Sequence, residues 1–306
     1  MDMQIMTVTG PISPEEVGTF LPHEHIMSCF GMDPAENPQY PVDELLAQVL
    51  PYLEKVKDLG LRTLADCTTA YFGRDPLLLR RISEESGIYL ITNTGYYGAA
   101  NGRYIPEHAY TESTEQIATR WTREWQDGIG DTGIRPGFIK TAVGDGPLSE
   151  INRKLIRAAI LTHLQTGLTI QTHLGNNVAA ADEILDMFDA EGADPGAWIW
   201  VHAHSMTNPN PLLKAASRGA WISLDGLSLE NAKRILQLMK ALKITSLFGQ
   251  ALLSHDGDLY CQGNLRPFDY LFTDFIPMMT RMGYKEEDIH ALTVENPAIA
   301  FTVTPR

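Results

Sequence analysis

Two histidines separated by a single residue, His23 and His25, follow a short apolar run at residues 17–21. Side chains of a β-strand alternate between its two faces, so a strand would direct both imidazoles to one side, where they can bind one metal ion. The spacing alone is also compatible with two polar residues at a strand end. It gains weight from further candidate ligands that each close a short apolar run of their own: Lys140, His173, His202 and Asp256. Packing alone does not explain that recurrence, which points to a metal site.

The composition indicates a soluble protein that acts on a small molecule. With a net charge of −14 and an isoelectric point near 5.0, the chain lacks the excess of Lys and Arg that gives a protein affinity for nucleic acid or anionic membranes. Its 306 residues fall within the usual size of one α/β barrel, and we expect a single domain over residues 1–306.

The cysteines and the N-terminus predict a cytoplasmic location. The cysteines are odd in number and form no CxxC pair, so reduced thiols are expected: Cys29, Cys67 and Cys261. The N-terminus carries neither a basic nor a long apolar segment, and no run of about 18 apolar residues occurs anywhere in the chain.

Eight β-rich runs alternate with eight amphipathic helical patterns along the chain. The expected strands cover residues 18–23, 63–67, 88–94, 137–143, 168–173, 198–202, 220–225 and 247–254, and the expected helices cover residues 42–59, 76–85, 111–127, 150–165, 179–190, 210–217, 229–242 and 267–282. Eight strand–helix units without a linker are typical of one α/β fold, the (β/α)8 TIM barrel. Its active site lies at the C-terminal ends of the strands, and every candidate ligand stands at such an end.

A dinucleotide site is disfavoured by the context of its motif. Residues 128–133 read GIGDTG and satisfy GxGxxG, but they follow a helical pattern and precede a strand. This is the reverse of the strand–turn–helix order that binds pyrophosphate. No P-loop, GxSxG or HExxH motif occurs, so the phosphate-loop, serine-hydrolase and zincin classes lack support.

The motifs of the chain resemble those of the phosphotriesterase family of the amidohydrolase superfamily, in particular its phosphotriesterase-like lactonases. The resemblance rests on HEH at residues 23–25, RPGFIK at 135–140, TIQTH at 169–173, WVH at 200–202 and SHD at 254–256. It extends from about Thr7 to the TVENP segment at 293–297, with the motifs in the same order. It implies a binuclear metallohydrolase on a (β/α)8 barrel and favours a homodimer.

The resemblance also implies a role for each ligand. The two histidines of HEH would bind the buried metal, which Asp256 completes, and His173 and His202 would bind the more exposed metal. Lys140 would bridge the ions after reacting with CO2, because an ammonium has no lone pair for a metal whereas a carbamate supplies two oxygens. The implied cofactors are two divalent transition-metal ions, foremost zinc, with manganese, iron or cobalt as alternatives. Asp256 would accept the proton of a hydroxide that bridges the metals, so Lys140 and Asp256 are predicted to be catalytic.

His202 and His204 compete for the fourth histidine position, because both lie on one face of an extended strand. The apolar run at residues 197–201 favours His202, which leaves His204 near the substrate or as a hydrogen-bonded loop histidine. By the same alternation His255 faces away from the barrel interior, and we expect it to be structural.

Two positions depart from the organophosphate-degrading members of the family. Those members carry a proton relay, made of an acid three residues beyond the fourth histidine and a histidine after the aspartate of the seventh strand. Here the positions hold Ser205 and Gly226, although Asp225 remains. Tyr97, by contrast, stands where lactonase-like members carry a tyrosine near the nucleophile, and we assign it to the catalytic and substrate-binding residues.

The loops after the third and eighth strands supply further candidates for substrate contact. Arg103 belongs to the first loop, and Tyr260 and Arg266 belong to the second. Together with Tyr97 and His204 they form the expected substrate-binding set. Arginine forks suit carboxylate or phosphate groups, although each arginine can instead pair with one of the many acids of the chain.

We therefore expect a lactonase that opens a small oxygenated lactone. Hydrolysis of an amide, a phosphodiester or a phosphotriester by the same site is the first alternative. A non-catalytic protein that binds a small molecule on the same barrel is the alternative from another class, and the complete ligand set argues against it.

Overall fold

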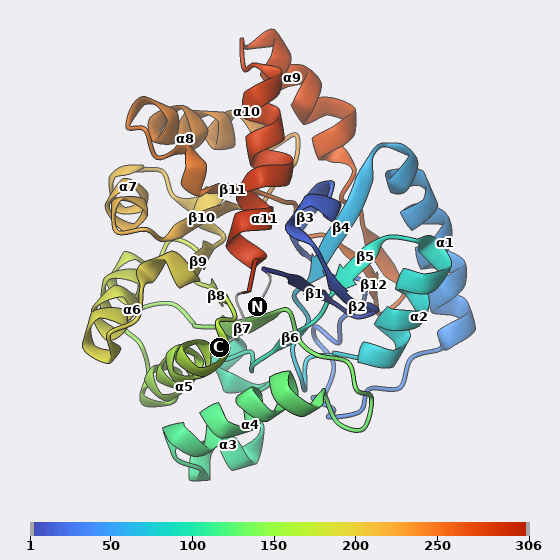
Figure 1. The fold of residues 1–306 in the computed structure, drawn as a ribbon, viewed down its shortest axis with the longest axis vertical. Helices are drawn as coiled ribbons and strands as arrows, with labels where there is room; N and C mark the ends of the chain where they lie inside the picture. The colour runs from blue at the N-terminus through green and yellow to red at the C-terminus, as the bar shows by residue number, and fades with distance from the viewer. Residues whose placement is uncertain (1–2, 304–306) are drawn as a thin grey trace.

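The computed structural model describes residues 3–303 and confirms the (β/α)8 barrel, with strands at the centre and helices around them (Figure 1). The barrel strands are β3 (Thr19–Glu24), β4 (Leu61–Asp66), β5 and β6 (Tyr89–Ile91 and Asn93–Thr94, one strand interrupted at Thr92), β7 (Phe138–Ala142), β8 (Ile170–His173), β9 (Trp198–Val201), β10 (Trp221–Leu224) and β11 (Ala251–Leu253). Strands β3 to β5 pair in parallel, as do β6 to β11. The backbone N–H of Asp256 donates to the carbonyl of His23 at 3.3 Å and connects the segment after β11 to β3.

Helices follow the strands largely where the sequence predicts them. They are α1 (Val42–Asp58), α2 (Pro76–Ser86), α3 (Glu107–Thr111), α4 (Thr114–Asp127), α5 (Glu150–Thr166), α6 (Val178–Glu191), α7 (Asn210–Ser217), α8 (Ala232–Ile244) and α9 (Ile276–Arg281). The helix expected at 111–127 is divided into α3 and α4, because Ser113 starts α4 with a reciprocal capping box to Gln116. The helix expected at 267–282 is a π-helical turn at Leu271–Phe275 that continues into α9.

Two hairpins and two short helices are additions that the sequence analysis did not anticipate. They are β1–β2 (Ile5–Thr7 and Gly10–Ile12), β12–β13 (Asp258–Cys261 and Asn264–Arg266), α10 (Glu286–His290) and α11 (Asn296–Phe301). The hairpin β12–β13 matters for function, because it follows the eighth barrel strand directly.

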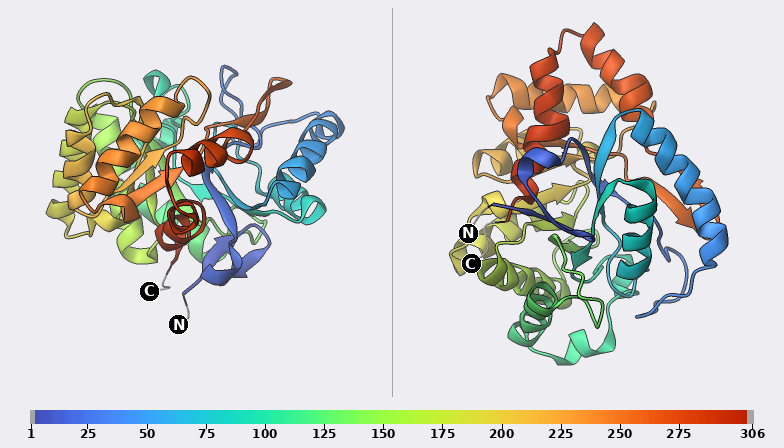
Figure 2. Two further views of the ribbon diagram at one scale, coloured as in Figure 1. Left: turned by 90° about the horizontal axis from the view of Figure 1, so that it is seen from above. Right: turned by 45° about the vertical axis from the view of Figure 1, so that its right-hand side comes forward.

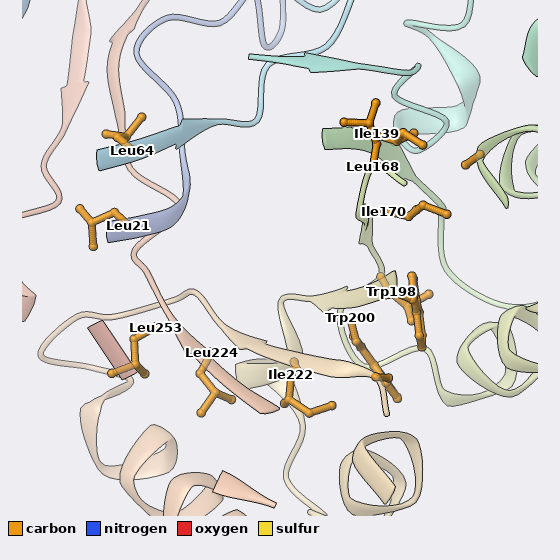
Figure 3. Packing of buried hydrophobic residues seen from close by; sticks show 14 of the residues in the cluster. Leu21, Leu64, Ile139, Leu168, Ile170, Trp198, Trp200, Ile222, Leu224 and Leu253 are labelled. Atoms are coloured by element: carbon orange, nitrogen blue, oxygen red, sulfur yellow. The ribbon is translucent and has the colours of Figure 1, made fainter. Parts of the chain in front are cut away.

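Strand alternation divides the apolar residues into two layers. Residues such as Ile139 and Trp200 belong to the layer between the strands and the surrounding helices (Figure 3). Phe20 and Phe138 belong to a second cluster, in which the ring of Phe301 lies 4.8 Å and 5.4 Å from their ring centroids. Because Phe20 and Phe138 stand at the beginnings of their strands, this cluster fills the N-terminal end of the barrel and leaves the C-terminal end for polar residues.

The two ends of the described chain lie side by side (Figure 2). The backbone N–H of Val303 donates to the carbonyl of Gln4 at 2.8 Å. Among residues 3–303 no helix is long and apolar enough to cross a membrane. Cys29, Cys67 and Cys261 are free thiols, in agreement with the expectation.

Candidate active site

A cavity of about 190 Å³ at the C-terminal ends of the strands contains all six predicted metal ligands. It is lined by His23, His25, Ser28, Phe30, Phe72, Tyr97, Lys140, His173, His202, Asp256, Asp258 and Arg266. Because pockets for drug-sized ligands usually measure about 300–1,000 Å³, this cavity suits a small substrate.

A β-bulge in β3 turns His23 toward the cavity. Residues 21 and 24 of β3 pair with residues 64 and 66 of β4, so β3 has one extra residue over this stretch. The extra residue shifts the alternation of side chains, and His23 faces inward although Leu21, two residues earlier, packs in the outer layer. Nε2 of His23 and Nε2 of His25 lie 3.3 Å and 3.4 Å from the same oxygen, Oδ1 of Asp256. The two histidines thus share one face of the strand, as predicted, and the bulge turns that face toward the cavity.

His202 and Asp256 reach the cavity through left-handed backbone conformations. Their φ angles are +60° and +58°, a region that costs about 1–3 kcal/mol for a residue with a Cβ. Plain alternation would turn His202 toward the helices, because Val201 before it packs in the inner cluster. Asp256 follows the outward-pointing His255, so alternation already directs its side chain toward the cavity. Such strain is typical of functional sites that the surrounding structure holds in place.

The carboxylate of Glu24 holds the segment that carries Asp256. It accepts hydrogen bonds from the backbone N–H groups of His255 and Gly257 and from Nδ1 of His255, at 2.6–2.8 Å. Nε2 of His255 accepts from the backbone N–H of Leu271 at 3.0 Å. His255 therefore points away from the cavity, in agreement with the structural role expected for it.

Hydrogen bonds fix the tautomers of the first two histidines. The amide nitrogen of Gln171 donates to a backbone carbonyl, so its Oε1 accepts from Nδ1 of His23 at 3.2 Å. The hydroxyl of Thr68 also donates to a backbone carbonyl, so its oxygen accepts from Nδ1 of His25 at 2.7 Å. Each imidazole thus presents the lone pair of Nε2 to the cavity, the arrangement found in metal-binding histidines.

His202 lies in the cavity wall and His204 lies beside it. Nε2 of His202 is 2.8 Å from Nδ1 of His173, and Nδ1 of His202 donates to Oδ1 of the buried Asp225 at 3.0 Å. His204 donates through Nδ1 to the same oxygen at 3.0 Å but is not part of the wall. The geometry is consistent with His202 as the fourth histidine ligand.

Replacing His202 with Ala is expected to lower the metal content from about two ions per chain to about one, because one imidazole of the more exposed position is lost. His204→Ala, the matched control on the same carboxylate, should keep both ions. Elemental analysis of both proteins after reconstitution with zinc measures the difference. A loss confined to His204→Ala would identify His204 as the ligand.

Lys140 is buried without a hydrogen-bond partner. Its side chain is 1% exposed, and among the described residues Nζ is one of the buried polar atoms that make no hydrogen bond. Burial lowers the pKa of its ammonium group and so favours the neutral amine, the form that can react with CO2. An unpartnered amine is costly in such a place, whereas a carbamate would find partners in two cations. The lysine therefore fits the bridging role.

The charges of the other ligands also fit a metal centre. Burial lowers the pKa of His23 to about 4, and burial together with His202 holds the pKa of His173 well below its ordinary value. Burial opposes the ionised form of Asp256, but His202, His23 and His25 still hold the pKa of this carboxyl well below its usual range. Burial also favours the neutral form of His25 and His202, but Asp256 beside His25 and Asp225 beside His202 raise the pKa of these two imidazoles above the ordinary value. They would therefore release a proton on binding a cation, because neutral imidazoles and an ionised carboxylate are the donors that Zn, Mn, Fe and Co accept.

Tyr97 lies in the cavity wall next to the predicted metal ligands. Its hydroxyl is 3.5 Å from Nδ1 of His173, and its ring stacks on Phe72 with centroids 4.7 Å apart. Burial raises the pKa of the phenol, so the hydroxyl stays protonated and can donate a hydrogen bond.

Among the predicted substrate contacts, Tyr97 and Arg266 line the cavity, whereas Tyr260, Arg103 and His204 do not. The hydroxyl of Tyr260 donates to Glu44 at 2.8 Å, and the guanidinium of Arg103 donates to Asp33 at 3.1 Å. Both side chains are occupied by acids, as the sequence analysis allowed for the arginines.

The sequence analysis missed four residues of the wall: Ser28, Phe30, Phe72 and Asp258. Three of them stand in the loops after the first two barrel strands, where the fold itself places active-site residues. Asp258 belongs to the hairpin β12–β13, which the sequence analysis did not recognise.

Ser205 and Gly226 stand at the two positions where the organophosphate-degrading members carry their proton relay. A Cβ added to Gly226 would lie 2.2 Å from Nε2 of His204, so the imidazole occupies the space of a side chain at position 226. The hydroxyl of Ser205 donates to the carbonyl of His202 at 2.8 Å. Neither residue supplies an acid.

Comparison with known proteins agrees with the motifs and the geometry. The model of the "Phosphotriesterase family" matches residues 3–301. A "Phosphotriesterase homology protein" of Escherichia coli (strain K12) is 29% identical and covers 95% of this chain and 100% of its own length. An "Aryldialkylphosphatase" of Saccharolobus solfataricus is 26% identical, over 95% of this chain and 97% of its own.

Solved structures show the same relationship. One, described as "Molecular Engineering of Organophosphate Hydrolysis Activity from a Weak Promiscuous Lactonase Template", has a TM-score of 0.86 at 25% identity and covers 97% of this chain and 99% of its own. Its likeness extends over the whole barrel, including the strands that carry the candidate ligands. The chain therefore belongs to the phosphotriesterase family and is a metal-dependent hydrolase.

Proposed function

We propose that the protein is a lactonase that opens a small oxygenated lactone. The observation that carries this proposal is the convergence of four histidines, Asp256 and a buried, unpartnered Lys140 in one small cavity. His23, His25, His173, His202, Lys140 and Asp256 would hold two divalent transition-metal ions, foremost zinc, with Lys140 carboxylated by CO2. Two such cations supply a Lewis acid for the scissile carbonyl and lower the pKa of the attacking water.

The residues of the chain then have separate tasks. The carboxylate of Asp256, next to Nε2 of both His23 and His25, is placed to accept the proton of the nucleophile. The neutral phenol of Tyr97 is placed to donate a hydrogen bond to an oxygen of the substrate. Phe72 supports the ring of Tyr97 and makes that wall apolar, which favours the flat ring of a lactone.

The relay positions favour a lactone over a phosphotriester. Ring opening leaves a strongly basic alkoxide that stays attached to the product and can take up the proton that Asp256 has accepted. An aryl phosphotriester instead releases a weakly basic aryl oxide, so that proton has to leave by another route, and Ser205 and Gly226 offer no relay for it. Phosphotriester hydrolysis remains the second candidate, because the relative from Saccharolobus solfataricus is described as an aryldialkylphosphatase.

The kcat/KM for the best simple lactone is expected to exceed that for an activated phosphotriester by at least about 10²-fold, or about 2.7 kcal/mol of transition-state stabilisation. The test is a side-by-side assay of five- and six-membered lactones, an aryl phosphotriester, an aryl phosphodiester and an N-acyl amino acid with the zinc-loaded protein. Faster turnover of the phosphotriester, the diester or the amide would overturn the lactonase assignment. Binding of a lactone without turnover of any compound would favour a non-catalytic binding protein.

A further inference from the structure

The hairpin β12–β13 brings an arginine and a buried carboxylate to the edge of the cavity. Its first strand forms parallel bridges to the segment after β3, His25 to Asp258 and Ser28 to Cys261. Asp258 and Arg266 are direct partners across the hairpin. Both side chains therefore face the cavity that contains the predicted metal ligands.

Asp258 is fixed in this position. Its side chain is fully buried, and its carboxylate accepts from the hydroxyl of Ser28 at 2.5 Å and from the backbone N–H of Tyr260 at 3.2 Å. These bonds leave the carboxylate little freedom to move toward the guanidinium of Arg266. The distance from Nη2 of Arg266 to Oδ2 of Asp258 is 3.7 Å, which is too long for a hydrogen bond.

Arg266 consequently has N–H donors that Asp258 does not engage. Its side chain is 57% exposed, and Asp258 is the one ion-pair partner it has within the described residues. Arg74, in contrast, makes two hydrogen bonds of 2.8 Å and 2.7 Å to the carboxylate of Glu124. A guanidinium offers five N–H donors in a planar fork, and those of Arg266 stand at the wall of the cavity.

The other side chains of the wall offer no competing cation near the entrance. Apart from the histidines and Arg266, the basic residue of the wall is Lys140, and its side chain is only 1% exposed. Phe30, Phe72 and Tyr97 make a further part of the wall aromatic. A substrate that carries a compact negative group can thus place it on Arg266 while its ring lies against the aromatic side chains.

We propose that Arg266, positioned beside Asp258, binds a compact anionic group of the substrate, so that the enzyme prefers a lactone bearing a carboxylate or a phosphate. This inference rests on the proposed lactonase function and narrows its substrate class. The planar fork of arginine matches both anions and binds them through paired, charge-assisted hydrogen bonds.

The test compares matched substrates on the zinc-loaded enzyme: a five-membered lactone with a ring carboxylate, the corresponding carboxamide, and a hydroxymethyl lactone with and without a phosphate. The wild-type enzyme should prefer at least one anionic member over its neutral partner by about 10-fold or more. Arg266→Met should lower kcat/KM for that anionic lactone by about 30-fold and for the neutral partner by less than about 3-fold. Arg266→Lys should restore part of the lost kcat/KM for the anionic lactone.

Arg81→Met, which removes a similarly exposed arginine from α2, is the matched control. It should change kcat/KM for neither the anionic nor the neutral lactone. Whichever anionic lactone is preferred, the carboxylate or the phosphate, identifies the anionic group that Arg266 binds on the substrate.

A binding measurement separates this inference from the lactonase assignment. Calorimetry with glutarate and with its monoamide should show that Arg266→Met weakens binding of glutarate by about 30-fold and of the monoamide far less. If no lactone is hydrolysed but this difference is seen, the lactonase assignment fails and the anion site stands. Equal turnover of anionic and neutral lactones by the wild type overturns the inference, and so does an equal loss for both in Arg266→Met.

Discussion

Lys140→Met is expected to abolish hydrolysis, with kcat/KM lower by at least about 10⁴-fold, or about 5.4 kcal/mol. Methionine keeps an unbranched side chain close in size to the aliphatic part of lysine but cannot form a carbamate, so the protein loses the donor that would bridge the two ions. Most of the bound metal should be lost with it. Turnover on the best lactone and elemental analysis after zinc reconstitution measure the two effects.

The same variant has a second readout that does not depend on activity. In the metal-free protein, Lys140→Met should be at least as stable as the wild type, because it removes a buried amine that has no hydrogen-bond partner. Urea unfolding of both metal-free proteins tests this. Lys233→Met, at an exposed position on α8, is the control for loss of a lysine elsewhere. A Lys140→Met protein that keeps its metal and its turnover would contradict the bridging role.

Asp256→Asn is expected to lower turnover by about 10³-fold while much of the metal is retained. The amide keeps an oxygen that can bind a cation, but it is a far weaker base than the carboxylate and cannot accept the proton of the nucleophile. Steady-state kinetics and metal analysis of the same preparation distinguish the two roles. Near-normal turnover would exclude Asp256 as the proton acceptor, and complete loss of metal would reduce its role to that of a ligand.

The (β/α)8 fold could be predicted because each barrel strand leaves a local signal. Short apolar runs mark the strands, amphipathic periodicity marks the helices, and the ligand candidates all stand at strand ends. The fold rule then places those ends at one face of the barrel, so residues as far apart in sequence as His23 and Asp256 could be assigned to one site.

Side-chain direction within the site was harder to predict, because it depends on local departures from a regular strand. The bulge in β3 re-aims His23, and the left-handed backbone at His202 reverses the direction that alternation would give. None of these departures involves a glycine or another recognisable signal at the residue itself. The prediction of the site rested on residue types, histidine and aspartate. The positions of these side chains depend on tertiary contacts, such as the hydrogen bonds of Glu24, that the sequence does not reveal.

The substrate-binding residues illustrate the same limit. Arginine and tyrosine in the loops are reasonable candidates by type, yet Arg103 and Tyr260 pair with acids that are distant in sequence, Asp33 and Glu44. Arg266 remains available because the hairpin pairs it with an aspartate that is held elsewhere. Such pairings are properties of the folded chain, and composition does not reveal them.

A crystal of the metallated protein grown with bicarbonate and analysed by anomalous scattering tests the central claim most directly. We predict two transition-metal ions per chain among His23, His25, His173, His202 and Asp256, with a carboxylated Nζ of Lys140 between them. A single ion, or an unmodified Lys140 in the fully metallated protein, would contradict the binuclear centre on which the proposed lactonase depends.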